Sequence, residues 1–172
     1  MEYTLRLWQP EDAVSLARYI NNIHIWNQVR DALPHPYTEA DARSYIAMAQ
    51  EEAAKGAPVN FAVVIDGKAV GGVGFIPGQD VERISAEIGY WLGEPFWGKG
   101  IMTDVVRRAS LQAFQTLTVT RLHAGVFGKN PASMRVLEKA GYVKEGIARK
   151  AVIKNGEIMD FHLYALLKED IV

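Results

Sequence analysis

The chain contains no cysteine, and this absence excludes disulfide bonds, thiolate metal sites and cysteine nucleophiles. It also fits a reducing compartment. No apolar run approaches the roughly 20 residues that a membrane-spanning helix needs. The first residues, Met1 to Leu7, lack the charged and then apolar plan of a signal peptide. We therefore expect a soluble, cytoplasmic protein without a membrane partner.

Basic charge is not in excess either, because the net charge is −1 and the sequence pI is about 6.4. A nucleic-acid-binding protein usually carries a basic surface, so no nucleic-acid partner is expected. The four histidines, His24, His35, His123 and His162, show no ligand spacing. No metal site is therefore predicted.

What the chain does have is enough apolar sequence for one full core, with 172 residues of which 49% are hydrophobic. Apolar periodicity, turn residues and caps predict the element order β-α-α-β-β-β-α-β-α-β-β. Residues 1–172 show no linker, repeat or low-complexity segment. We expect a single α/β domain with a mixed central sheet of about seven strands and about four helices.

The boundaries of these elements follow from local signals. Thr38 to Asp41 resembles a capping box, and Asn130 with Pro131 is typical of a helix start. Asp66-Gly67 and Asn155-Gly156 predict two hairpin turns. The expected strands are Tyr3–Trp8, Phe61–Ile65, Lys68–Ile76, Ile84–Leu92, Arg121–Phe127, Val143–Ile153 and Ile158–Leu167. The expected helices are Pro10–Ile20, Thr38–Gly56, Met102–Leu117 and Asn130–Ala140, and Asn21–Tyr37 is expected to be irregular or weakly helical.

A glycine-containing loop is the most informative feature. The apolar run Ile88–Leu92 ends at Gly93, Gly98 and Gly100 flank Lys99, and a helix begins near Ile101. Glycines allow the backbone to approach oxygen atoms closely, and the N–H groups at a helix start point toward negative charge. The segment therefore predicts a binding site for the phosphates of a cofactor.

Three kinds of phosphate loop fit this segment to different degrees. A nucleoside-triphosphate loop needs Ser or Thr after the lysine, but Gly100 stands there, and Pro95 lacks an N–H. The dinucleotide fingerprint needs a third glycine where Thr103 stands. The remaining alternative is a loop for the pyrophosphate of coenzyme A.

The run from Ala86 to Thr103 resembles the central motif of the GNAT acyltransferase superfamily, and most closely that of the ribosomal-protein N-terminal acetyltransferases. The segments Asn27–Thr38 and Asn130–Tyr142 resemble two further motifs of this branch. The family pattern matches at Gly100, whereas Trp97 and Met102 replace its usual first and last residues. The resemblance extends from about Leu5 to Lys168.

This resemblance implies a GNAT fold in which strands Ile84–Leu92 and Arg121–Phe127 part to admit the pantetheine arm of acetyl-CoA. The backbone of Tyr90, Trp91 and Leu92 would pair with that arm, and the N–H near Leu92 would meet the developing oxyanion. The loop residues Trp97, Gly98, Lys99, Gly100, Ile101, Met102 and Thr103 would hold the pyrophosphate. Asn130 would contact the cofactor, cap its helix, or do both.

The implied reaction moves an acetyl group from a thioester to a primary amine, either a protein N-terminal α-amine or a small amine. An alkylammonium must first lose a proton to a base. Glu87 is the candidate base, although a salt bridge, a role in orienting the amine, or a base made only of water remains open. Alternation places Glu87 on the strand face opposite Ile88.

Ser133 is the candidate that hydrogen-bonds the departing sulfur, and a solvated helix-start serine is its alternative. Leu137 stands where many family members have a catalytic tyrosine, so that assignment is excluded. Trp26 and Tyr37 are candidates for the acceptor pocket by resemblance, and Asp160 for attraction of an ammonium group. Trp26 as a lid anchor and Asp160 as a surface carboxylate remain open.

Because no activated nucleophile is evident, we expect direct transfer in a ternary complex. A non-catalytic sensor of acyl-CoA is the competing hypothesis, since it would keep Gly98, Gly100 and Asn130 without needing Glu87 or Ser133. A homodimer is a further possibility, because dimers are frequent in this branch.

Overall fold

The computed structural model describes residues 1–171 and shows a mixed α/β fold. Its strands are hydrogen-bonded in the order β1-β2-β3-β4-β5-β7-β6, an open sheet of seven strands in the described residues. The strands are β1 (Thr4–Arg6), β2 (Asn60–Ile65), β3 (Lys68–Pro77), β4 (Ser85–Leu92), β5 (Arg121–Phe127), β6 (Val143–Lys154) and β7 (Glu157–Leu167). The α-helices are α1 (Ala13–Ile20), α2 (Ile23–Trp26), α3 (Glu39–Ala54), α4 (Ile101–Thr116) and α5 (Pro131–Lys139). The predicted fold class is confirmed.

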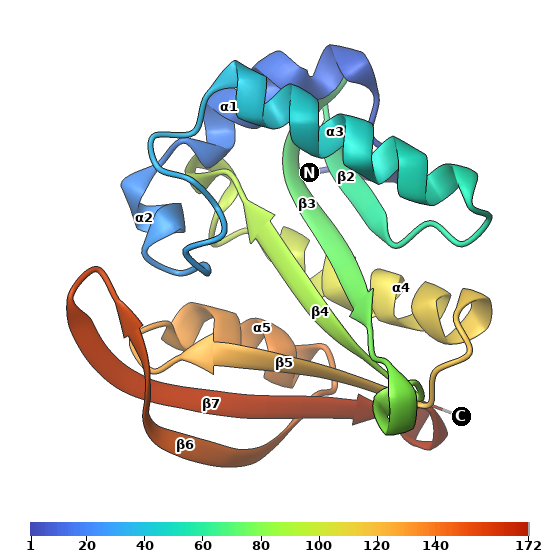
Figure 1. The fold of residues 1–172 in the computed structure, drawn as a ribbon, viewed down its shortest axis with the longest axis vertical. Helices are drawn as coiled ribbons and strands as arrows, with labels where there is room; N and C mark the ends of the chain where they lie inside the picture. The colour runs from blue at the N-terminus through green and yellow to red at the C-terminus, as the bar shows by residue number, and fades with distance from the viewer. Residues whose placement is uncertain (172) are drawn as a thin grey trace. The chain divides into compact units, whose positions relative to one another are not determined.

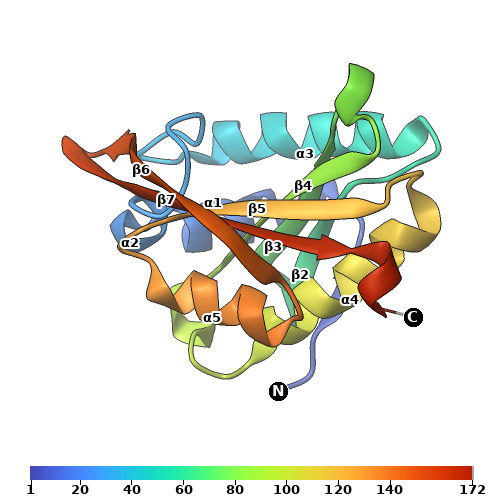
Figure 2. The ribbon, with the colours of Figure 1, turned by 90° about the horizontal axis from the view of Figure 1, so that it is seen from below.

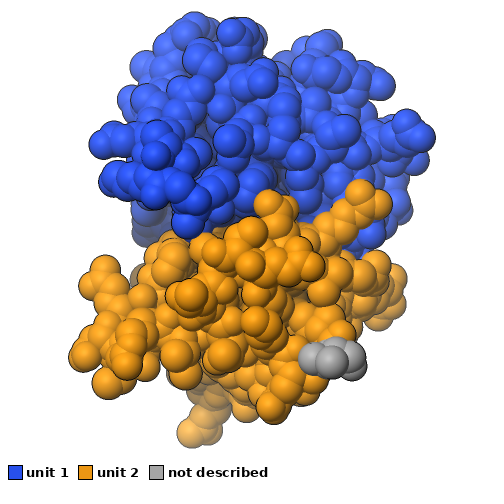
Figure 3. Space-filling view, turned by 90° about the vertical axis from the view of Figure 1, so that its right-hand side faces the viewer, with its two compact units in different colours: residues 1–74, 90–105 blue, residues 75–89, 106–172 orange. Residues whose placement is uncertain are grey.

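The chain divides into two compact units, each made of two chain segments (Figure 3). Unit 1 contains residues 1–74 and 90–105, and unit 2 contains residues 75–89 and 106–172. Strands β3 and β4 and helix α4 each contribute residues to both units.

Unit 1 is built on the antiparallel pairs β1–β2 and β2–β3, with helices α1 and α3 packed against each other beside them (Figure 1). Its buried cluster includes Trp8, Leu16 and Ile46, each 2% exposed or less. The predicted capping box is confirmed, because the hydroxyl of Thr38 accepts from Asp41 N–H and the Asp41 carboxylate accepts from Thr38 N–H. This cap fixes where α3 begins, so the irregular segment before it has a defined end.

Gly71 of β3 allows a close backbone approach. A Cβ at Gly71 would lie 2.7 Å from the carbonyl oxygen of Trp91, a distance that no side chain tolerates. The β2–β3 register also shifts between Val63 and Val64, which marks a bulge in this pair. The end of β4 is thereby seated against β3, and the loop that follows it starts from a fixed position.

Unit 2 contains β5, whose seven residues all pair antiparallel with β7. Its pairs with β4 are parallel and join Ser85–Glu87 to Arg121–His123. Helix α5 covers one face of β5 and β7 (Figure 2), and Tyr164 of β7 donates a hydrogen bond to Glu138 of that helix. The predicted hairpin turn Asn155-Gly156 joins β6 to β7 with positive φ at both residues.

Short helical turns occur at two places. The segment expected to be irregular or weakly helical contains the one-turn helix α2, which the side chain of Asn22 caps by accepting from His24 N–H. Short 3₁₀ turns at Asp80–Glu82 and Glu94–Phe96 precede and follow β4. In both cases one turn of helix is too short for a periodic apolar pattern to reveal it.

Candidate functional site

The loop predicted to bind phosphate joins β4 to α4 within unit 1. Gly98 and Gly100 have φ angles of +72° and +76°, the left-handed region that glycine adopts without strain. A Cβ at either position would meet nothing within 4 Å, so the space beside the loop is open. The first hydrogen bond of the helical turn runs from Asp104 N–H to the Gly100 carbonyl at 3.3 Å. The N–H groups of residues 101–103 precede this bond, and such groups at a helix start can donate to an anion.

The indole of Trp97 connects this loop to the end of β4. Its Nε1–H donates to the carbonyl oxygen of Leu92 at 2.6 Å, although 44% of the residue is exposed. Gly93 N–H donates to the Val70 carbonyl at 2.7 Å, which ties the same point to β3. The sequence did not indicate the Trp97–Leu92 bond, because a side chain that reaches back five residues has no local signature.

Aromatic rings support the turn in front of the loop. Tyr19 of α1 packs edge-on against Phe96 with ring centroids 5.6 Å apart, and the Lys99 ammonium lies 5.8 Å from the Phe96 ring centroid. This cation–π contact holds Lys99 at the loop without neutralising its charge. The loop therefore combines backbone donors, a helix start and one cation, the groups that bind a pyrophosphate.

Glu94 links this turn to α2 through two polar contacts. Asn22 Nδ2 donates to its carboxylate at 2.6 Å, and His24 Nδ1 lies 3.1 Å from the same oxygen. The hydrogen bond from Asn22, followed by that from His24, lowers the pKa of Glu94. Sequence reasoning missed this link, since the partners are about seventy residues apart.

The acceptor-side candidates of unit 1 occupy different environments. Trp26 is half-buried and stacks on His35, with centroids 5.5 Å apart and ring planes at 29°. Tyr37 is 6% exposed and belongs to the core cluster, where burial raises its pKa to about 12. The side chain of Tyr37 is thus committed to packing, whereas Trp26 retains an accessible part.

Unit 2 holds the predicted residues of the second cofactor motif. The Asn130 side chain accepts a hydrogen bond from Ser133 N–H at 3.2 Å and caps α5, which confirms its structural role. Ser133 lies in the first turn of this helix and is half-buried. Asn130 therefore fixes the backbone of Ser133.

Glu87 lies on the less buried face of β4. Its neighbours Ala86 and Ile88 are 0% and 4% exposed, whereas Glu87 is half-buried and Gly89 is exposed. The predicted alternation is confirmed, and Glu87 faces away from the packed side of the strand.

Asp160 has a contact that the sequence did not predict. Its Oδ1 accepts from Lys150 N–H at 2.9 Å, beside the register shift of β6 between Ala148 and Val152. Lys150 has a φ of +50°, so the carboxylate satisfies the backbone of a bulge.

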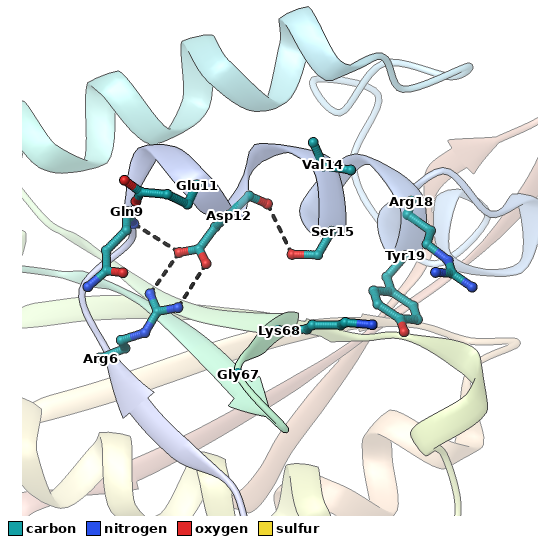
Figure 4. A pocket seen from close by; sticks show the side chains of 10 residues that line it. All are labelled: Arg6, Gln9, Glu11, Asp12, Val14, Ser15, Arg18, Tyr19, Gly67 and Lys68. Atoms are coloured by element: carbon teal, nitrogen blue, oxygen red, sulfur yellow. Dashed lines mark hydrogen bonds and ion pairs between the residues drawn. The ribbon is translucent and has the colours of Figure 1, made fainter.

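A separate cavity of about 330 Å³ lies in unit 1 beside α1 (Figure 4). None of the predicted site residues lines it. The carboxylate of Asp12 faces the Arg6 guanidinium there, with hydrogen bonds of 2.7 and 2.8 Å. Burial acts to raise the pKa of Asp12, but the hydrogen bonds from Arg6 and from Gln9 N–H outweigh it and lower the pKa. This ion pair joins Arg6 of β1 to the 3₁₀ turn Pro10–Asp12 that precedes α1.

Two further features are absent from residues 1–171. No helix there combines the length and the apolar character that crossing a membrane requires. No group of three or more His, Asp or Glu side chains there is placed to hold a metal ion.

Comparison with known proteins places these features in a family. Residues 3–143 match the model of the acetyltransferase (GNAT) domain. The chain is 40% identical over 136 residues to the probable N-acetyltransferase YjcK of Bacillus subtilis, covering 78% of this chain and 75% of that protein. It is 32% identical over 173 residues to the putative ribosomal N-acetyltransferase YdaF of the same organism, covering 97% and 92%.

A solved structure agrees with the sequence relatives. The microcin C7 self-immunity acetyltransferase MccE, crystallised with acetyl-CoA and AMP, superposes with a TM-score of 0.82 at 26% identity. The match covers 96% of this chain and 92% of that one. The loop geometry, the family model and these relatives lead to one conclusion: the chain belongs to the GNAT acetyltransferase family and is an acetyl-CoA-dependent N-acyltransferase.

Proposed function

We propose that this protein transfers the acetyl group of acetyl-CoA directly to a primary amine, with protein N-terminal α-amines as the acceptor class. The observation that carries the proposal is the loop at Gly98 and Gly100, where left-handed glycines open the backbone at the start of α4. A relative at 32% identity is a putative ribosomal N-acetyltransferase, which supports a protein amine as acceptor.

The residues at the loop fit a diphosphate. The backbone donors of residues 98–103 and the Lys99 ammonium would hold its oxygens, while Trp97 keeps the loop closed on Leu92. The backbone of Tyr90, Trp91 and Leu92 would pair with the pantetheine arm. The side chain of Trp91 packs against the core cluster of unit 1, which keeps its backbone in place.

When bound, acetyl-CoA supplies the thioester whose acetyl group the amine accepts. We propose that Glu87 takes the proton from the ammonium group, because an amine without a lone pair does not attack. The half-buried setting of Glu87 on the less packed face of β4 supports this role. The Ser133 hydroxyl would donate a hydrogen bond to the departing sulfur, from a helix start held by Asn130.

The candidates for binding the acceptor amine are Trp26, Tyr37 and Asp160, and their environments differ. Trp26 offers an accessible ring for an aliphatic stem or a cation. The burial of Tyr37 favours a supporting role, and the contact of Asp160 with Lys150 N–H favours a role in shaping the hairpin. We further infer a single domain over residues 1–172, a cytoplasmic location and a possible homodimer.

The proposal is tested with the purified protein by two measurements. Calorimetry with acetyl-CoA tests binding, and release of free thiol tests turnover with a panel of N-terminal peptides and small amines. The same peptides with blocked N-termini are the control. We expect binding and turnover with free N-terminal amines. Turnover with small amines alone would overturn the acceptor class, and binding without any turnover would indicate a sensor.

A further inference from the structure

We propose that His123 positions Glu87 for proton transfer, an inference that rests on the proposed role of Glu87 as the base. Glu87 and His123 are Cα partners in the parallel register of β4 and β5. Neighbouring strands lie about 4.8 Å apart, so partner residues project side by side from the same face. Within residues 1–171, Glu87 and His123 form the last register pair between β4 and β5.

The pattern of burial identifies the face that they share. On β5, Leu122 and Ala124 are 0% and 5% exposed, whereas His123 between them is half-buried. Glu87 likewise lies between two buried residues of β4. Both side chains therefore leave the packed face and stand together on the less buried one.

His123 is available for such a contact. In the part of the chain that the structure describes, its ring makes no hydrogen bond or ion pair. Its ring acts electrostatically on Glu145, which is bound by Arg121. Arg121 and Glu145 form a two-bonded ion pair of 2.6 and 2.8 Å. The hydrogen bond from Arg121 lowers the pKa of the Glu145 carboxyl, and His123 makes a smaller contribution in the same direction. On β7, the register partner of His123 is the apolar Ala165.

These neighbours suggest what the imidazole does. Because the Arg121 guanidinium already occupies the Glu145 carboxylate, Glu87 is the acceptor that register places directly beside His123. A neutral imidazole has one N–H donor, and a bond from it to a Glu87 oxygen would orient that carboxylate toward the amine proton. Such bonds often form only when substrate is bound.

The experiment is a double-mutant cycle with four proteins: wild type, Glu87→Gln, His123→Leu and the double variant. We expect His123→Leu to lower kcat about tenfold with the KM for acetyl-CoA unchanged, since misplacing a reacting group costs rate rather than cofactor binding. In the Glu87→Gln background the same change should have no further effect. His123→Gln, which keeps an N–H donor, should recover most of the lost kcat.

Arg121→Lys is the matched control, because Arg121 lies on the same strand and face but is the partner of Ser85, and a lysine keeps a cation beside Glu145. Its effect should add to that of Glu87→Gln. If Glu87→Gln keeps full turnover, the base assignment fails and this inference fails with it. If Glu87→Gln loses turnover but His123→Leu has no effect or a fully additive one, only the role of His123 is overturned. Melting temperatures of all variants identify any loss caused by unfolding.

Discussion

The indole Nε1–H of Trp97 donates to the carbonyl oxygen of Leu92 at 2.6 Å, so the residue before the first loop glycine is bonded to the last residue of β4. This bond spans the 3₁₀ turn Glu94–Phe96 and fixes the distance between strand end and helix start. The backbone donors of the loop are therefore arranged before any ligand arrives. Preorganisation of this kind reduces the ordering cost of binding.

Replacing Trp97 by phenylalanine tests this arrangement. Trp97→Phe keeps an aromatic ring but removes the N–H donor, so the loop loses its bond to the Leu92 carbonyl. We expect the Kd for acetyl-CoA to rise about fivefold, corresponding to ~1 kcal/mol for one hydrogen bond. Isothermal titration calorimetry measures the change. An unchanged Kd would show that the loop keeps its shape without this bond.

The left-handed glycine Gly100 offers a second test with a matched control. Gly100 and Gly156 have the same φ of +76°, and a Cβ at either would meet nothing within 4 Å. An alanine at either position costs about 1 kcal/mol of backbone strain. We expect Gly100→Ala and Gly156→Ala to lower the free energy of unfolding equally. Gly100→Ala should weaken acetyl-CoA binding about tenfold, whereas Gly156→Ala should leave it within twofold.

Equal effects of the two glycine variants on binding would contradict a specific role for the loop. Denaturant unfolding measures the cost of backbone strain, and calorimetry on the same preparations measures acetyl-CoA binding. The comparison is clean because the turn of Gly156 joins β6 to β7 and contains no predicted cofactor residue.

Local signals in the sequence predicted most of the fold. The strand Arg121–Phe127 has the predicted bounds, and the caps at Thr38 and Asn130 begin α3 and α5 as expected. A capping box, a Pro at the first helical position and an Asn-Gly turn each depend on a few neighbouring residues. Their physical causes are local, and a single sequence therefore contains them.

Contacts between distant segments could not be predicted in the same way. Glu94 bonds to Asn22 and His24, and the Asp160 carboxylate satisfies a backbone N–H at Lys150. Neither side chain shows by its position in the sequence which group it will meet. Tyr37 was predicted as an acceptor residue from its segment, yet its ring is buried in the core. Such roles depend on tertiary packing, which residue type and spacing do not determine.

Asn130 combines a structural role with a predicted cofactor contact, and its substitution separates the two. Asn130→Ala removes the acceptor for Ser133 N–H and should lower the free energy of unfolding by about 1 kcal/mol. Asn130→Ser restores a cap and should restore that stability. We expect acetyl-CoA affinity to stay reduced in Asn130→Ser if the amide itself contacts the cofactor.

Thr38→Ala is the control for this experiment, since Thr38 is also an N-cap residue, of α3, and is not a predicted cofactor ligand. It should lose similar stability and keep acetyl-CoA affinity. If both affinity and stability return in Asn130→Ser, capping alone explains the residue. Chemical denaturation and calorimetry give the two quantities.

The ion pair between Arg6 and Asp12 predicts how stability depends on pH. The pKa of Asp12 is lower in the folded chain than its ordinary value, because the bonds from Arg6 and Gln9 N–H outweigh the effect of burial. A lowered carboxyl pKa contributes stability that is present above the unfolded pKa, about 3.9, and is lost as the pH falls through the folded value. We expect Asp12→Asn to lower the free energy of unfolding at pH 7 by about 2 kcal/mol. The difference from wild type should shrink as the pH falls below about 4. Urea unfolding of both proteins between pH 3 and 7 measures this difference in the free energy of unfolding, because the range includes the pH at which Asp12 titrates in the unfolded chain. A constant difference across the range would exclude Asp12 as the titrating group.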